Sequence, residues 1–175
     1  MNIRHAIVGA PHVAPEIGEL TIVADGPVII GIYYPGHWTN PDRSAFGAEV
    51  DAASDPVIAA AAAQLGEYLR GERTAFDVAT RAAGSACEQR VWKELREIPF
   101  SETVTSGELA ARLGDRAMAR MVGQAVGHNP LSIVVPCHRV VGATGSLTGY
   151  AGGLDRKRFL LALEGALAPA QPALF

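Results

Sequence analysis

Cysteine is scarce in this sequence, and long apolar segments are absent. The 175 residues include only two cysteines, Cys87 and Cys137. A disulfide between them would be unusual in a reducing compartment, so both are expected to be free thiols. No apolar run approaches the roughly 20 residues that span a bilayer. The first residues, "MNIRHAIVGAPHV", lack the apolar core of a signal peptide. A soluble protein of the cytoplasm is therefore expected.

Metal-binding patterns are also missing. The five histidines and two cysteines show none of the spacings that are typical of zinc sites, so no metal and no other cofactor is expected. With 49% hydrophobic residues, the chain can bury a core without disulfides or metal. Its length fits one domain or two small ones, and it contains no internal repeats.

Charge divides the chain into two unlike parts. The formal net charge is −3, but residues 1–84 carry five basic and ten acidic side chains, whereas residues 85–165 carry ten basic and eight acidic ones. In the second part, Arg112, Arg116 and Arg120 are opposed by few acidic residues. Such a stretch can bind a polyanion. A solvated helical face is the alternative, and charge alone favours that alternative.

The first part of the chain predicts a sheet followed by a helix. Residues 18–34, "GELTIVADGPVIIGIYY", contain two β-rich segments around an Asp-Gly pair, which is a strong hairpin signal. Asp55 and Pro56 are a favourable N-cap and first helical residue, and Gly71 marks the end of that helix. The stretch "AFDV" at 75–78 predicts a further short strand.

Beyond a short glycine-containing linker, the second part is predicted to be helical. Ser85 and Glu88 form a capping-box pattern before one helix, which Pro99 ends. Thr105 and Glu108 repeat the pattern before another helix.

A helix-turn-helix is the next expected element. Gly114 follows the short helix at Thr105, and residues 116–126 resume helical periodicity. Two short helices joined by a tight glycine turn outline a helix-turn-helix, although many helical hairpins bind nothing. A last amphipathic helix has Asp155 at its start or in its first turn and ends at Gly165.

Residues 133–142, "IVVPCHRVVG", interrupt an apolar run with chemically active side chains. Pro136 cannot donate a ladder hydrogen bond, so a strand must end or lie at an edge there, and the chain turns at Cys137. A thiol is an adequate nucleophile only as thiolate. His138 is the candidate base, through a helical turn or a bridging water, and Glu164 can hold its other nitrogen. A buried cysteine beside a satisfied histidine is the alternative.

Four segments together carry a resemblance: "CEQRVWKELREIPFSET", "ARMVGQAVGHNP", "VVPCHRVVG" and "GYAGGLDRKRFLLALEG". In order and spacing they closely resemble the O6-alkylguanine-DNA alkyltransferases (methylated-DNA–protein-cysteine methyltransferases). The resemblance is strong over residues 84–165 and looser over the N-terminal hairpin, "HW" and "LGEYLRGERTAFDV". It implies an α/β N-terminal domain of ribonuclease H-like type at 1–80, with a mainly structural role. It further implies a mainly α C-terminal domain with a helix-turn-helix at 84–165, α+β overall, and a surface tail at 166–175.

The resemblance also implies the activity. The family transfers a methyl or other alkyl group from O6 of guanine in duplex DNA, with O4 of thymine as a further candidate, irreversibly to its own cysteine. Each molecule reacts once, because the thioether product lacks the leaving-group ability that would restore the thiol. The expected partner is double-stranded DNA containing O6-alkylguanine, bound by a monomer, with cooperative assembly on DNA left open.

The resemblance assigns roles to individual residues. Cys137 accepts the alkyl group, His138 deprotonates it through water, and Glu164 orients the imidazole. Tyr150 donates its hydroxyl to N3 of the guanine, which offsets negative charge on the departing base. Asn129 ties the helix-turn-helix to the cysteine turn.

A guanine pocket is implied by the same segments. Its expected members are Val140, Tyr150, Ala151 and Gly152. The carbonyls of Cys137 and Val140 are expected to accept from the exocyclic amine of guanine, and the glycine-rich backbone around position 150 lets the chain approach the base closely.

The target base must be rotated out of the duplex before the cysteine can reach it, at a cost of a few kcal/mol. Arg120 matches the family's arginine that enters the stack from the minor groove in place of the base. Further DNA contacts are expected at Ser106, Gly107, Asp115, Ala119 and Ala143. Ser106 departs from the family, which usually has tyrosine there. Losing that aromatic contact costs on the order of 1–3 kcal/mol, which predicts weaker or slower repair.

Three other functions remain alternatives. A damage sensor binds alkylated DNA without transfer, but sensors of this family lack the cysteine that is present here as Cys137. An acceptor for small alkylated molecules is favoured by Ser106 and by the overall acidity. A cysteine hydrolase lacks a visible oxyanion-hole motif and leaves the arginine helix unexplained. Cys87, at a position that is commonly phenylalanine, is interpreted as a packing residue.

Overall fold

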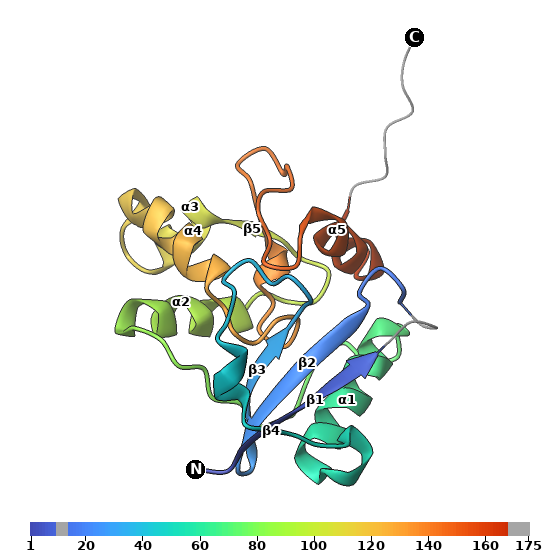
Figure 1. Cartoon of the computed structure of the whole chain (residues 1–175). Coiled ribbons are helices and arrows are strands. Elements are labelled where there is room, and N and C mark those ends of the chain that lie inside the picture. Colours follow the sequence, from blue (N-terminus) through green and yellow to red (C-terminus); the bar gives the residue numbers. More distant parts are fainter. Residues whose placement is uncertain (10–13, 168–175) are drawn as a thin grey trace.

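The structure is a computed structural model that describes residues 1–9 and 14–167. It has the α+β organisation that the sequence predicts, with a mixed sheet and a helix in the N-terminal part and a helical C-terminal part (Figure 1). Of the predicted tail, residues 168–175 lie outside the described residues. No helix in the described ranges is long and apolar enough to cross a membrane.

The N-terminal sheet has four strands in the order β3-β2-β1-β4. They are β1 (Ile3–Gly9), β2 (Glu19–Asp25), β3 (Val28–Tyr33) and β4 (Ala48–Glu49). The pairs β1/β2 and β2/β3 are antiparallel, and β4 pairs with β1 in parallel. The predicted hairpin is therefore confirmed, and Gly26 provides its turn with a φ of 54°, which glycine adopts at little cost. Two 3₁₀ turns, Arg43–Phe46 and Ala52–Ser54, flank β4.

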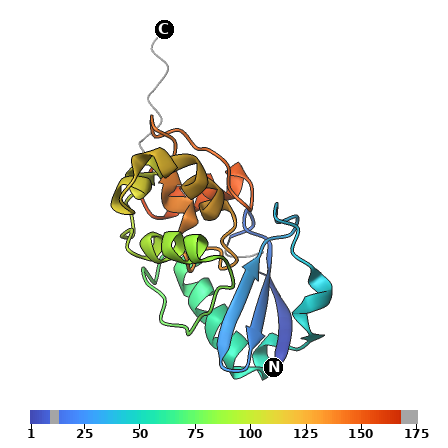
Figure 2. The same cartoon turned by 90° about the vertical axis from the view of Figure 1, so that its left-hand side faces the viewer.

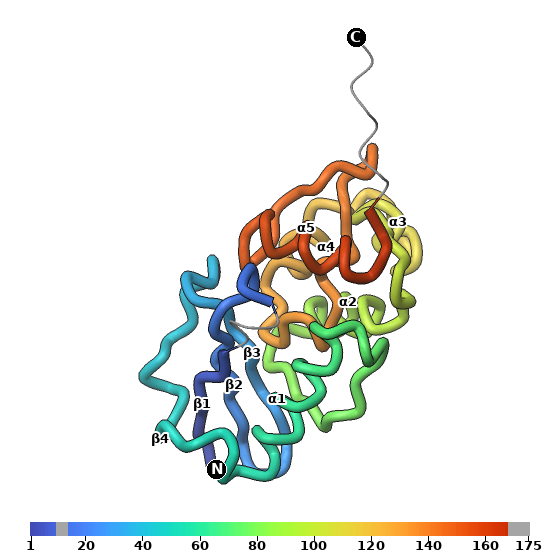
Figure 3. Tube along the Cα trace, turned by 90° about the vertical axis from the view of Figure 1, so that its right-hand side faces the viewer, coloured from blue at the N-terminus to red at the C-terminus, as the bar shows by residue number. Residues whose placement is uncertain are grey.

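Helix α1 (Pro56–Leu69) covers one face of this sheet. The predicted cap is confirmed, since the Asp55 carboxylate accepts from the backbone N–H groups of Val57 and Ile58. Figures 2 and 3 view the molecule from opposite sides, and both show the green α1 alongside the blue strands. Ile58 and Leu65 of α1 join the buried core that the strands supply.

The strand predicted at 75–78 is wrong. The chain makes only an isolated bridge to the sheet, between Thr80 and Ile29. Before that point the backbone N–H of Asp77 donates to the side chain of Gln64 on α1, and Phe76 packs against the core. The helix therefore provides the hydrogen-bond partner that a neighbouring strand would have provided.

The C-terminal part contains the predicted helices. Helix α2 (Ala86–Arg96) begins with a complete capping box and ends three residues before Pro99. The short strand β5 (Val104–Thr105) leads into α3 (Ser106–Arg112), which has the second predicted capping box. After a tight turn and a 3₁₀ segment at Arg116–Met118, α4 (Ala119–Gly127) completes the helix-turn-helix.

The segment that carries the cysteine is not a strand before Pro136, contrary to the sequence-based expectation. Leu131 makes an isolated bridge to Ile32, residues 132–134 form a turn, and the next strand is β6 (Val140–Val141), after a 3₁₀ turn at Cys137–Arg139. Strand β6 pairs in parallel with β5, at the start of α3. The cysteine turn is thereby joined directly to the helix-turn-helix.

The two parts of the chain share one hydrophobic core. The backbone of Ile32 on β3 donates to Pro130 and accepts from Ser132, so the sheet edge is hydrogen-bonded to the turn that precedes the cysteine. The final helix α5 (Leu154–Leu163) has Asp155 in its first turn and is followed by Gly165, as predicted. Because of this shared core, the N-terminal part supports the site. The domain boundaries predicted at residues 80 and 84 stay predictions.

Candidate active site

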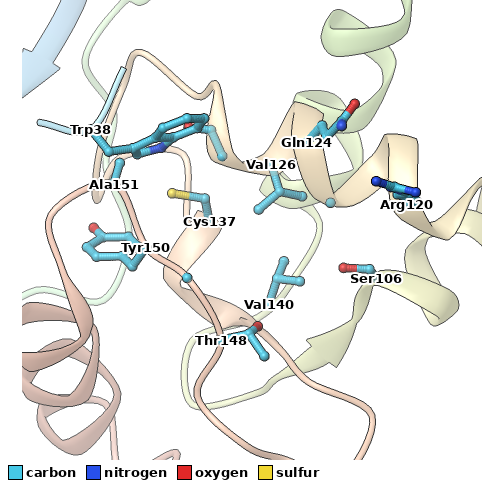
Figure 4. Close-up of a pocket in the computed structure, with 13 residues that line it drawn as sticks. Trp38, Ser106, Arg120, Gln124, Val126, Cys137, Val140, Thr148, Tyr150 and Ala151 are labelled. Carbon is cyan, nitrogen blue, oxygen red and sulfur yellow. The ribbon is translucent and has the colours of Figure 1, made fainter. Parts of the chain in front are cut away.

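A pocket of about 560 Å³ opens where the cysteine turn meets the helix-turn-helix. Figure 4 shows Cys137 near its middle, with Trp38 and Tyr150 on one side and Arg120 and Ser106 on the other. Of the sequence-predicted site residues, those that line the pocket are Cys137, Val140, Tyr150, Ala151, Arg120 and Ser106. Six of the thirteen residues that line the pocket are therefore among those that the sequence predicted for the site.

Asn129 holds the turn that presents the cysteine. Its side-chain amide donates to the carbonyl of Val135, 2.9 Å away, and its carbonyl oxygen accepts from the backbone of Leu131 at 2.9 Å. Ile133 within this turn has a φ of 71°, a costly conformation for a β-branched residue. Asn129 is buried, and its side chain supplies hydrogen-bond partners that a neighbouring strand would otherwise have supplied to this backbone. It therefore stabilises the strained turn before Cys137.

His138 and Glu164 form a buried pair behind the thiol. The His138 Nε2 lies 2.9 Å from Glu164 Oε1, and both side chains are fully buried. Because the carboxylate can only accept, Nε2 carries the proton and donates it, which leaves Nδ1 as the acceptor. Nδ1 has no hydrogen-bond partner among the described residues. The pair is therefore arranged so that His138 can accept a proton.

Glu164 also receives two donors that the sequence analysis did not assign. Arg139 binds its carboxylate through Nε and Nη2, at 2.8 Å for the closest contact, and the Tyr68 hydroxyl of α1 donates to Oε1 at 2.7 Å. Burial alone would raise the pKa of Glu164, but the hydrogen bonds from His138, Arg139 and Tyr68 outweigh it and lower that pKa to about 2. Glu164 is thus an anion whose charge is already balanced by Arg139.

Burial dominates the protonation of the two central groups. It raises the pKa of the Cys137 thiol, against the opposing effects of Asn129 and Lys157. It lowers the pKa of His138, even though Glu164 opposes this. At neutral pH the site therefore contains a thiol next to a neutral imidazole, so forming the thiolate requires transfer of the thiol proton to a base.

Tyr150 and its neighbours build the opposite wall. The Tyr150 hydroxyl lies 2.8 Å from the hydroxyl of Tyr34, at the end of β3. Ala151 is buried in the wall, and its carbonyl accepts from the backbone N–H of Trp38. Gly152 does not line the pocket, contrary to the expectation from the resemblance, because it packs against the ring of Tyr34.

Lys157 crosses beneath the pocket from α5. It is 1% exposed, and its Nζ donates to the carbonyls of Val140 and Thr148 at 2.5 and 2.8 Å. Burial lowers its pKa to about 8, which the nearby Cys137 opposes. The Val140 carbonyl, expected to receive the guanine amine, therefore already accepts one donor, and only its second lone pair can accept another.

The helix-turn-helix contributes one side of the pocket. Ser106 begins α3, and Arg120 is an exposed residue in the first turn of α4. The other predicted DNA contacts do not line the pocket but lie at the surface or partly buried around it: Gly107, Asp115, Ala119 and Ala143. Asp115 accepts from the backbone of Ala117 and so caps the 3₁₀ segment before α4, which gives it a structural function.

Trp38 lines the pocket, although no role was predicted for it. Its side chain is 55% exposed, stacks on His128 and donates through Nε1 to the carbonyl of Gly127 at 2.9 Å. Trp38 follows β3 in the chain, so the N-terminal part supplies a wall of the pocket.

Four further residues of the site were also missed: Tyr34, Tyr68, Arg139 and Lys157. Arg139 stands beside His138 in the quoted motif, and that adjacency was a usable signal. Tyr34, Tyr68 and Lys157 lie on other elements, and only the tertiary fold brings them to the site. Both cysteines are free, as predicted. No cluster of three or more His, Cys, Asp or Glu side chains in the described part of the chain is arranged to hold a metal.

Comparisons with known proteins agree with this geometry. The family described as "6-O-methylguanine DNA methyltransferase, DNA binding domain" matches residues 86–166. Methylated-DNA–protein-cysteine methyltransferases from Mycobacterium bovis and Mycobacterium tuberculosis are each 47% identical over 167 residues, covering 91% of this chain and 93% of the relative. The crystal structure of Mycobacterium tuberculosis OGT in complex with DNA is similar with a TM-score of 0.81 and 42% identity, covering 95% of this chain and 96% of that chain.

Proposed function

Because the chain belongs to the methylated-DNA–protein-cysteine methyltransferase family, we propose that Cys137 is the residue that accepts the alkyl group. The protein is an O6-methylguanine DNA methyltransferase that repairs alkylated DNA, and it binds DNA. The observation that best supports Cys137 as the acceptor of the alkyl group is its position in a pocket to which the helix-turn-helix contributes one side. The second thiol, Cys87, lies on α2 and does not line that pocket.

The proposed substrate is an O6-alkylguanine that has been rotated out of duplex DNA into this pocket. Arg120, at the rim, is the candidate for filling the space that the base leaves. Ser106, Gly107, Ala119 and Ala143 are proposed to lie along the DNA backbone. Ser106 lines the pocket, and Gly107 and Ala119 are next to the pocket residues Ser106 and Arg120 in the chain. Arg112 of α3 and Arg120 of α4 are exposed and are therefore suited to phosphate contacts.

The proposed reaction begins with proton transfer. His138 is neutral, and its Nδ1 is free to accept the thiol proton of Cys137 through one bridging water. Glu164 fixes the imidazole tautomer and stabilises the imidazolium that forms. Arg139 already balances the charge of Glu164. We therefore expect Glu164 to act mainly by orienting His138, and only weakly by raising the basicity of its imidazole.

The thiolate then attacks the alkyl carbon. A sulfur–carbon bond forms, the carbon–O6 bond breaks, and its electron pair remains on the guanine. Tyr150 donates a hydrogen bond to N3 as negative charge spreads into the ring. The free carbonyl lone pairs of Cys137 and Val140 are proposed to hold the exocyclic amine. The product is a thioether, so each protein molecule reacts once.

Intact-mass spectrometry tests the proposal. Incubation with a duplex that contains one O6-methylguanine should add one methyl group per protein, located on Cys137 by peptide mapping. Cys87→Ser is the matched control and should still gain the methyl group, whereas Cys137→Ser should bind the duplex without any gain. Binding without transfer by the unaltered protein would indicate a sensor, and transfer only from free O6-alkylguanine would indicate a small-molecule acceptor. A monomeric state and a cytoplasmic location stay predictions.

A further inference from the structure

The N-terminal sheet places a buried hydroxyl against Tyr150, a residue of the pocket wall. Tyr34 directly follows β3 and is 0% exposed. Its hydroxyl oxygen lies 2.8 Å from the hydroxyl oxygen of Tyr150, and the two rings meet edge to face, with centroids 5.7 Å apart. Tyr34 lies outside the segment that matches the family's DNA-binding domain, residues 86–166.

We infer that Tyr34 is a positioning residue for alkyl transfer, whose hydroxyl donates to the Tyr150 oxygen and so directs the Tyr150 proton at the departing guanine. The inference rests on the proposed function of Tyr150. It gives the N-terminal part a function in the reaction, beyond the mainly structural role that the sequence predicted for it.

The direction of the hydrogen bond follows from counting donors. Each phenol has one proton, and within the described residues each of these two hydroxyls has the other as its hydrogen-bond partner. If Tyr150 donates its proton to N3 of guanine, its oxygen is left as an acceptor. The Tyr34 hydroxyl must then donate its proton to that oxygen, because a buried O–H group without an acceptor would lose the free energy of one hydrogen bond. The resulting chain is Tyr34 to Tyr150 to guanine.

The surroundings hold Tyr34 in this orientation. Gly152 lies so close to its ring that an added Cβ would be 2.6 Å from the nearest ring carbon. The Arg156 guanidinium also lies over the ring, 5.0 Å from the centroid. Arg156 is itself fixed by hydrogen bonds to the carbonyls of Ile17 and Gly152. The ring is therefore held in place by contacts with the loop that carries Tyr150 and with a cation.

Both phenols are suited to donate rather than to ionise. Burial is the main reason that the pKa values of Tyr34 and Tyr150 are raised, so both keep their protons at neutral pH. The positive charge of Arg156 opposes this for Tyr34 and makes its O–H a stronger donor.

The chemical step stays balanced with Tyr34 as a donor only. The sulfur–carbon bond forms as the carbon–O6 bond breaks, and the electron pair passes to the guanine, where N3 shares the charge. The Tyr150 hydrogen bond to N3 strengthens, and its oxygen becomes more negative. The bond from Tyr34 then becomes charge-assisted and strengthens too, while Tyr34 keeps its own proton.

Single-turnover kinetics with two free bases test this inference. O6-benzylguanine and its 8-aza analogue differ in how well the ring stabilises negative charge. The 8-aza ring stabilises it better. Tyr34→Phe should slow the reaction with O6-benzylguanine about tenfold and slow the 8-aza reaction less. Tyr33→Phe is the matched control on the adjacent residue, whose ring packs on Phe46, and it should leave both rates unchanged.

A double variant separates positioning from general support. If Tyr34 acts through Tyr150, the variant Tyr34→Phe/Tyr150→Phe should be no slower than Tyr150→Phe alone. Additive losses, or an equal loss on both bases, would show that Tyr34 only supports the fold and would overturn the inference. Rates of Tyr34→Phe equal to those of the unaltered protein would also overturn it. Failure of the unaltered protein to accept any alkyl group would instead refute the proposed function.

Should Tyr34→Phe fail to fold, fluorinated tyrosine at position 34 provides the second test. Replacing ring hydrogens with fluorine keeps the hydroxyl and makes it a stronger donor. The O6-benzylguanine rate should then rise with the acidity of the residue-34 phenol. A rate that does not change with that acidity would overturn the inference.

Discussion

Replacing Glu164 by glutamine removes the negative charge that is paired with Arg139. Arg139 is 7% exposed, and its guanidinium donates to both Glu164 oxygens and to the carbonyl of Ile98. Breaking a buried ion pair on one side leaves the other charge uncompensated and typically costs about 3–5 kcal/mol. We expect Glu164→Gln to lower the free energy of unfolding at pH 7 by that amount, measured by urea denaturation. Glu102→Gln, at an exposed position, is the matched control and should have little effect.

A second substitution reverses part of this loss. In Arg139→Met/Glu164→Gln no unpaired charge remains, and methionine keeps much of the apolar volume. The double variant should therefore be more stable than Glu164→Gln alone, although less stable than the unaltered protein. Simple addition of the two single losses would refute the conclusion that the pair is held together by charge compensation.

The same pair gives the protein a distinct acid response. The pKa of Glu164 is lowered from its ordinary 4.5 to about 2 in the folded protein. A lowered carboxyl pKa stabilises the fold above the unfolded value and loses that stabilisation as the pH falls from 4.5 towards 2. At about 1.4 kcal/mol per pH unit this contribution is about 3 kcal/mol. At pH 3, which is about 1.5 units below the unfolded value, about 2 of these 3 kcal/mol should be lost from the unaltered protein and not from Glu164→Gln, as measured by urea denaturation at pH 7 and pH 3. Equal losses in both proteins would contradict the assignment.

Three further substitutions test other parts of the site. Arg120→Ala should slow duplex repair about tenfold or more, because extruding a base costs a few kcal/mol, but should leave the rate with free O6-benzylguanine within about twofold; equal losses on both substrates would count against a flipping role. Ser106→Tyr should quicken duplex repair, since an aromatic contact is worth about 1–3 kcal/mol, and no change would refute that explanation. Lys157→Met should shift alkylation of Cys137 by iodoacetamide to higher pH, because the lysine charge lowers the thiol pKa; an unchanged pH profile would refute that link.

Local signals in the sequence gave correct helices. Asp55, Ser85 and Thr105 were each predicted to begin a helix, and each accepts the expected backbone hydrogen bond. Capping depends on residues within one turn of each other, so the sequence contains all the information that it needs. The hairpin around Gly26 was correct for the same reason.

The two strand predictions that were wrong depended on distant partners. Residues 75–78 and 133–135 have the composition of strands, but a strand also needs a neighbour in register. Gln64 on α1 binds the backbone of Asp77, and Asn129 binds the backbone of Val135, so each segment satisfies its polar groups without a ladder. Which side chain would supply such a partner cannot be deduced from the segment itself.

The sequence by itself was sufficient to predict the candidate reactive group and its immediate neighbours, because Cys137, His138 and the surrounding motif are contiguous in the chain. It also determined that a helix-turn-helix would accompany them. Only the tertiary structure decided the electrostatic state of the site. Arg139 and Tyr68 lower the pKa of Glu164, and Lys157 opposes the raised pKa of Cys137. From the N-terminal part, Trp38 lines the pocket and Tyr34 contacts the Tyr150 hydroxyl. The physical reason is that charge balance and burial depend on distances in space, which residues far apart in sequence acquire only when the chain folds.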